Sequence, residues 1–81
     1  MSDRIRTIIK DYAGLSTDVD ALPEDADLFQ AGMTSHASLS VMLALEEAFD
    51  VEFPDSMLKR HIFSSISSIG TALGELGVLV A

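Results

Sequence analysis

Apolar residues return every three or four positions along much of the chain, which is the spacing of amphipathic helices. The first such run starts after Ser2, a residue type that caps helices, and ends at Gly14. A second run extends from about Ser35 to Phe49. The apolar positions expected inside are Ile5, Ile8, Ile9 and Tyr12 in the first helix, and Val41, Met42, Leu45 and Phe49 in the second.

Two further helices are predicted in the last third of the chain. The first of them begins at Asp55 or Ser56 and covers the short segment SMLKRHIF. The other covers SSISSIGTALGELG, with Ser64 or Ser65 as N-cap and Gly77 as C-cap. Its inward positions are Ile66, Ile69, Leu73 and Leu76. Because no segment alternates convincingly like a strand, the pattern predicts an all-α four-helix bundle with a short third helix.

The connection between the first two helices, residues 15–34, is long for a small domain. Loops of this length are usually functional or held down by their own side chains. Apolar residues punctuate this one at Leu15, Val19, Leu22, Leu28 and Phe29. We therefore expect the loop to cross the bundle and to insert Leu28 and Phe29 into the core.

Charge narrows the classes of partner. The 81 residues, expected to form a single domain over 1–81, carry 13 acids and 5 bases, a net charge of -8, and Asp11 to Leu58 contains no Lys or Arg. This argues against nucleic acid, whose phosphates require a basic patch. It favours partners with basic docking surfaces, unless the acidity serves solubility alone.

Features that the sequence lacks exclude several kinds of site and bear on where the protein is located. No Cys is present, so a disulfide framework, a thiol nucleophile and a thiolate metal site are excluded. No apolar run approaches the roughly 18 residues of a membrane span, and the N-terminus lacks the apolar run of a signal peptide. We expect a cytoplasmic monomer that does not contact membranes.

Three serines, Ser35, Ser38 and Ser40, lie where the loop turns into the second helix. A hydroxyl at a helix N-terminus can cap free N–H groups, or carry a phosphate that those groups and the helix dipole favour. Ser35 lies at the junction itself, and Thr34 is available to cap in its place. Ser35 is therefore the best candidate for a phosphoryl attachment.

The order Gly-x-x-Ser-helix, followed by LALEEAFDVEFPD, resembles the acyl carrier protein family, and the resemblance extends from DADLF to FSSISSI. It implies a non-catalytic protein with 4′-phosphopantetheine on a serine at the start of helix two. The family motif is usually Asp-Ser-Leu, which Ser38-Leu39 matches in part. Two family spacings nevertheless select Ser35, which lies three residues after Gly32 and fourteen before Phe49.

Two departures from the family motif narrow the cargo that the resemblance implies. Thr34 replaces the usual Asp, and His36 replaces a leucine. This TSHAS variant resembles stand-alone carriers of amino acids or other small acyl groups, held as a thioester on the arm. The implied partners are a phosphopantetheinyl transferase, an acyl- or aminoacyl-loading ligase, and a downstream acyltransferase or synthase.

The second helix supplies the expected docking surface for these partners. One stripe at helical spacing lies away from the predicted core, and two further residues flank it. The expected partner-facing residues are Thr34, His36, Leu39, Leu43, Glu46 and Glu47. Two alternatives remain open: the leucines belong to the core, and the two glutamates are ordinary solvated residues.

The residues also bear on classes of function other than a carrier. In an unmodified acidic interaction module, Ser35 would serve only as an N-cap. A hydrolase is disfavoured because Ser35 and His36 are adjacent on a helix and cannot face each other. A calcium loop fails at Pro23 and Phe29, where glycine and glutamate are required. A weak divalent site remains conceivable among Asp18, Asp20, Glu24, Asp25 and Asp27.

Overall fold

Three α-helices and three short 3₁₀ turns build the fold in a computed structural model that describes residues 2–78. The helices are α1 (Ser2–Tyr12), α2 (Ser35–Phe49) and α3 (Ile66–Glu75), and the turns are η1 (Val19–Ala21), η2 (Asp55–Met57) and η3 (Arg60–Phe63). No strand occurs within these residues. The expected all-α class is confirmed.

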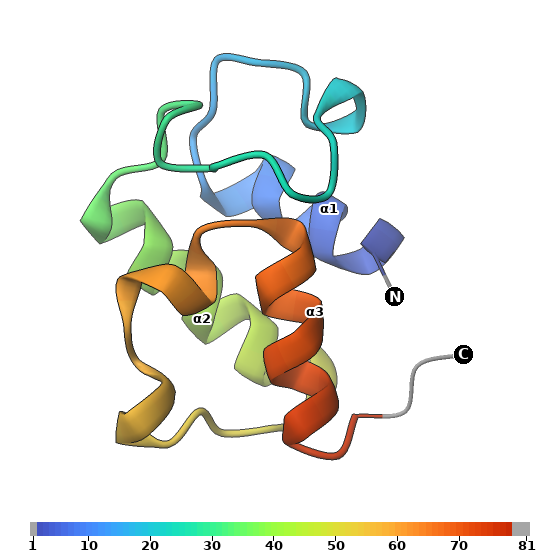
Figure 1. Ribbon diagram of the computed structural model, residues 1–81, viewed down its shortest axis with the longest axis vertical. Coiled ribbons are helices and arrows are strands. Elements are labelled where there is room, and N and C mark those ends of the chain that lie inside the picture. Colours follow the sequence, from blue (N-terminus) through green and yellow to red (C-terminus); the bar gives the residue numbers. More distant parts are fainter. Residues whose placement is uncertain (1, 79–81) are drawn as a thin grey trace.

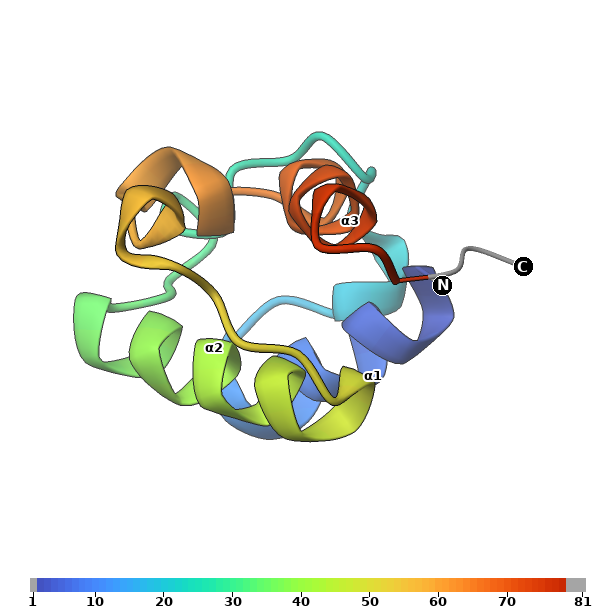
Figure 2. The same cartoon turned by 90° about the horizontal axis from the view of Figure 1, so that it is seen from below.

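The helices form two layers around one core. Figure 2 shows α1 and α2 on one side, with α3 and the segment containing η2 and η3 on the other. The loop between α1 and α2 arches over one end of the bundle (Figure 1). The fully buried side chains are Ile5, Ile9, Leu28, Val41, Leu45, Ile66, Ile69 and Leu73.

The predicted third helix is not an α-helix. Residues 55–63 instead contain η2 and η3, with Leu58 and Lys59 between the two turns in non-helical backbone conformations. The bonds in the turns join residues three apart, as from the Ile62 N–H to the Lys59 carbonyl. Neither turn has a side-chain cap. Three α-helices and a 3₁₀ segment (residues 55–63, with η2 and η3) therefore replace the expected four helices. In this segment Phe63 is buried and Leu58 is 45% exposed, so its apolar residues do not form the single inward row that favours a continuous helix.

Tyr12 was wrongly predicted to be an inward position of α1. Its side chain is 51% exposed, while Ala13 is buried and donates its N–H to the Ile9 carbonyl. Ala13 therefore continues the i, i+4 row of Ile5 and Ile9, and Tyr12 falls outside this row. Among the other predicted inward positions, three are half-buried and pack against the core: Met42, Phe49 and Leu76.

The helix ends largely follow their sequence signals. Gly14 (φ 68°) and Gly77 (φ 87°) adopt left-handed conformations just beyond α1 and α3. Ser65, one of the two predicted caps, begins α3 with a capping box that it shares with Ser68. Ser2, the predicted cap of α1, is itself the first helical residue, and residue 1 lies outside the described part of the chain.

The long loop is held down as expected. Leu28 is fully buried, and its N–H bonds to the Ser64 carbonyl at 2.7 Å. The Ser67 N–H bonds to the Glu24 carbonyl at 2.8 Å. Phe29 is half-buried, so it contributes less to the core than predicted. These bonds tie the loop to the 3₁₀ segment and α3, and thereby fix the residues that precede α2.

Charged groups from α1 hold the opposite part of the loop. Arg6 donates to the Val19 and Leu22 carbonyls at 2.7 and 2.8 Å. Lys10 pairs with Asp20, and this hydrogen bond raises the pKa of the Lys10 ammonium from its ordinary value despite an opposing desolvation effect. The loop acids make local turns, and in residues 2–78 no three His, Asp or Glu side chains gather as metal ligands.

Candidate functional site

Thr34 caps α2, which leaves the neighbouring serine hydroxyl unused. The Thr34 backbone is extended, and its Oγ1 accepts the Ala37 N–H at 3.0 Å. Ser35 is the first residue of the helix and is exposed. No group within residues 2–78 forms a hydrogen bond to its hydroxyl. The expectation that Thr34 caps in place of Ser35 is confirmed, and an interaction module that needs Ser35 as its N-cap is not supported.

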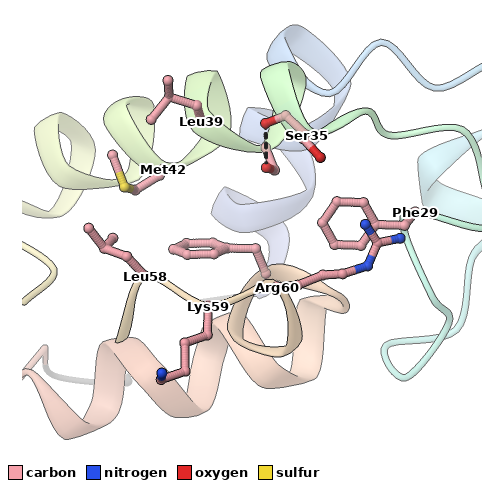
Figure 3. Close-up of a pocket in the computed structure, with 9 residues that line it drawn as sticks. Phe29, Ser35, Leu39, Met42, Leu58, Lys59 and Arg60 are labelled. Carbon is pink, nitrogen blue, oxygen red and sulfur yellow. Dashed lines mark hydrogen bonds between the residues drawn. The ribbon is translucent and has the colours of Figure 1, made fainter. Parts of the chain in front are cut away.

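The other two serines are less accessible than Ser35. The Ser38 hydroxyl donates to the Ser35 carbonyl at 2.7 Å, the bond drawn as a dashed line in Figure 3, and the residue is half-buried. Ser40 is also half-buried and lies further along α2. Of these three serines, Ser35 alone is both exposed and located at the positive end of the helix dipole.

A groove of about 350 Å³ opens beside Ser35. One wall is the first half of α2 and the other is the 3₁₀ segment, with Phe29 from the loop at one end (Figure 3). Its lining is mainly apolar, with one Lys and one Arg at its margin. The lining residues are Phe29, Ser35, Ser38, Leu39, Met42, Leu58, Lys59, Arg60 and Phe63.

Helical periodicity does not predict the far wall of this groove. Leu58, Lys59 and Arg60 reach the Ser35 region through the path of the 3₁₀ segment, which helical periodicity does not describe. Leu58 is 45% exposed. A usable signal was present, because Lys59 and Arg60 are the first basic residues after the long acidic stretch that begins at Asp11.

The predicted partner-facing stripe is largely exposed. Leu39 and Leu43 are 50% and 54% exposed, so the alternative that places them in the core is wrong. Val41 and Leu45 take the fully buried positions of the helix. His36 and Glu47 are also exposed and share the stripe with the two leucines. This face of α2 thus offers apolar and acidic side chains together.

Glu46 differs from its neighbour Glu47. It is half-buried, and its Oε2 accepts the Phe53 N–H at 2.8 Å. This bond joins the end of α2 to the segment that follows it. Glu46 therefore has a structural contact, whereas the exposed Glu47 side chain forms no hydrogen bond or ion pair with residues 2–78.

The site can receive a group but is not arranged to activate a nucleophile. His36 follows Ser35 on the same helix, and no base within residues 2–78 hydrogen-bonds to the serine. An exposed hydroxyl at a helix N-terminus suits a phosphoryl group that a second enzyme attaches. Fold and site together define a small helical protein that presents an exposed serine hydroxyl at the start of α2.

Comparison with known proteins identifies the class. The family model described as "Phosphopantetheine attachment site" matches residues 3–73. An aminoacyl carrier protein from Agrobacterium fabrum (strain C58 / ATCC 33970) is 48% identical over 69 residues, which cover 85% of this chain and 83% of the relative. The chain belongs to the phosphopantetheine-attachment family: it is a carrier protein with a covalent 4′-phosphopantetheine, and not itself an enzyme.

Solved structures agree with the fold. A crystal structure of an engineered Bradyrhizobium japonicum glycine:[carrier protein] ligase, complexed with a carrier protein from Agrobacterium tumefaciens and AMP, contains a similar chain. That chain is 44% identical with a TM-score of 0.89, and the match covers 91% of this protein and 99% of that chain. A solution structure of an A. tumefaciens protein is 44% identical with a TM-score of 0.73, covering 93% and 90%.

Proposed function

We propose that Ser35 carries the 4′-phosphopantetheine and that residues 1–81 act as one carrier domain. One observation carries the assignment: Ser35 is exposed at the first position of α2, while Thr34 makes the cap. Modification of Ser35 consequently removes no hydrogen bond from the fold. Modification of Ser38 would break its bond to the Ser35 carbonyl.

The residues around Ser35 fit a phosphodiester. The first N–H groups of a helix lack helical partners and favour an anion beside them. Exposure leaves room for the attached arm, whose terminal thiol supplies thioester chemistry to a chain without cysteine. The protein's own part is to hold the arm at a fixed point and to present it to partner enzymes.

We propose that the cargo is an amino acid or a similarly small acyl group. Support comes from the 48% identical aminoacyl carrier protein, and from the structural relative in complex with a glycine:[carrier protein] ligase. His36 also stands where fatty-acid carriers usually present a leucine to their partners. A dedicated loading ligase would therefore be the enzyme that distinguishes this chain from other carriers.

Partner enzymes are proposed to dock on the exposed stripe of α2. These are a phosphopantetheinyl transferase, the loading ligase, and a downstream acyltransferase or synthase. Leu39 and Leu43 would enter an apolar pocket, and Glu47 would meet Arg or Lys at its rim. Thr34 and His36 border Ser35 and so lie where each partner must approach. We place this exchange in the cytoplasm, with the carrier as a monomer.

Mass spectrometry of the intact protein tests the attachment site. The wild type, Ser35→Ala and Ser38→Ala are each incubated with coenzyme A and a broad-specificity phosphopantetheinyl transferase. We expect a phosphopantetheine-sized gain in the wild type and in Ser38→Ala, and none in Ser35→Ala. Circular dichroism of each variant confirms that the fold is intact.

Two results would contradict the proposal. A gain lost in Ser38→Ala and kept in Ser35→Ala would move the attachment to the other serine. Failure of the folded wild type to gain mass with several transferases would argue against modification of this chain.

A further inference from the structure

Three of the five Lys and Arg side chains bond to other parts of the fold and do not line the groove beside Ser35. Arg4 donates to the Ala48 carbonyl at 2.8 Å, at the C-terminal end of α2. Arg6 bonds to two carbonyls of the long loop, and Lys10 pairs with Asp20. All three therefore serve contacts within the fold. Lys59 and Arg60 are the remaining bases, and both line the groove beside Ser35.

Arg60 is held in place without a carboxylate. Its guanidinium carbon lies 3.9 Å from the centroid of the Phe29 ring, and no acid within residues 2–78 forms a salt bridge with it. Figure 3 shows the guanidinium against the Phe29 ring at one end of the groove, whereas the Lys59 side chain extends away from Ser35. The two neighbouring cations thus differ in their relation to the attachment site.

A guanidinium stacked on an aromatic ring keeps its in-plane N–H donors available. These donors match the geometry of phosphate oxygens, and the stacking holds the planar guanidinium in position before an anion binds. The local charge is also unusual, since the protein carries a net charge of -8 and would in general repel an anion. The positively charged guanidinium of Arg60, held in the groove beside Ser35, offsets that repulsion locally.

We propose that Arg60 binds the phosphodiester of the arm carried by Ser35. This inference rests on the proposed attachment of 4′-phosphopantetheine to that serine. In it, Arg60 restrains the phosphate end of the arm, while the thiol end stays free to reach a partner. Arg60 is a positioning residue and takes no part in thioester chemistry.

Phosphorus-31 relaxation of the modified protein tests the contact directly. Holo wild type, Arg60→Gln and Lys59→Gln are prepared with coenzyme A and transferase, and intact mass confirms that each carries the arm. Both variants lose one positive charge at adjacent exposed positions, so Lys59→Gln is the matched control. The Nε–Hε signal of Arg60 in the wild type is also compared between the apo and the holo protein.

We expect the phosphorus signal to relax more slowly in Arg60→Gln than in wild type, with Lys59→Gln close to wild type. The Arg60 Nε–Hε signal should shift on modification, and about 1 M salt should remove the difference between wild type and Arg60→Gln. The equilibrium between the bound and the free phosphodiester should change by up to about five-fold, which is the range for an exposed charge pair.

Equal relaxation in wild type and Arg60→Gln would overturn the inference while leaving the attachment intact. If Arg60→Gln and Lys59→Gln changed the relaxation equally, the effect would come from the general positive charge of this segment. That result would also overturn a specific role for Arg60. If the folded wild type gains no arm, the mass result contradicts the proposed attachment itself, so the two failures are distinguishable.

Discussion

Thr34 and Ser35 divide between them two tasks that one residue could have performed. Thr34 satisfies a free N–H of α2, and the hydroxyl of Ser35 stays open. A carrier whose attachment serine also capped the helix would lose the cap on modification. With the arm on Ser35, as proposed, this division would let the protein gain the arm without changing the start of the helix.

This division predicts opposite effects for neighbouring substitutions. Thr34→Ala should lower the free energy of unfolding by about 1 kcal/mol, because the Ala37 N–H loses its acceptor. Ser35→Ala should change it by less than about 0.5 kcal/mol, because no described group bonds to that hydroxyl. Urea unfolding of the apo variants measures both. A larger loss for Ser35→Ala would show that Ser35 takes part in capping.

At the scale of elements, α2 depends on the chain that follows it. Its C-cap residue Asp50 has a left-handed backbone with φ 53°, and its N–H bonds to the Glu46 carbonyl. The Glu46 side chain then accepts the Phe53 N–H. Phe53 in turn meets Phe63 edge-to-face, with ring centroids 5.3 Å apart. One glutamate therefore links α2 to the 3₁₀ segment.

Adjacent glutamates should consequently behave differently when truncated. Glu46→Ala leaves the N–H of the buried residue Phe53 without its acceptor and should cost about 1 to 3 kcal/mol of unfolding free energy. Glu46→Gln keeps an acceptor and should cost less. Glu47→Ala, at an exposed position, should stay within about 0.5 kcal/mol. Thermal and urea unfolding check all three, and equal losses at 46 and 47 would disprove the structural role of Glu46.

Periodicity recovered α1, α2 and the last helix because each turns its apolar residues regularly toward one core. It failed for the 3₁₀ segment, where Phe63 is buried and Leu58 is exposed for reasons of tertiary packing. Ser35 could be proposed from sequence because its signals, the loop–helix junction and the family spacings to Gly32 and Phe49, lie within one short stretch of the chain. Arg60 could not, because it meets the Ser35 groove through the loop residue Phe29 and the fold between them.

At the scale of the whole molecule, charge and apolar surface favour brief encounters. The net charge is -8, and the exposed face of α2 presents Leu39 and Leu43 together with Glu47. Long-range attraction speeds the approach of a basic partner, and a small apolar contact then fixes its orientation. Such contacts are easily reversed, which suits a carrier that several enzymes must bind in turn. None of the described helices is long and apolar enough to cross a bilayer.

Raising the salt concentration should separate the electrostatic from the apolar contribution to partner binding. The kcat/KM of the proposed loading ligase should fall steeply as ionic strength rises from about 0.01 to 1 M, since the Debye length shrinks from roughly 30 to 3 Å. Leu43→Ala should lower kcat/KM by about tenfold at every salt concentration, because the lost contact is apolar. Steady-state loading of the holo carrier measures both. A salt-independent wild type would exclude electrostatic steering.

The two walls of the groove are unequal in how they are held. On one side, α2 is a fifteen-residue helix with a side-chain cap and two fully buried residues. On the other, η2 and η3 are short, lack side-chain caps and are anchored chiefly at Phe63. Local opening of such a segment requires less free energy than global unfolding. If the arm is carried by Ser35 as proposed, we expect residues 55–63 to adjust to a docked enzyme more readily than α2, while the hydrogen bonds at the start of α2 stay formed.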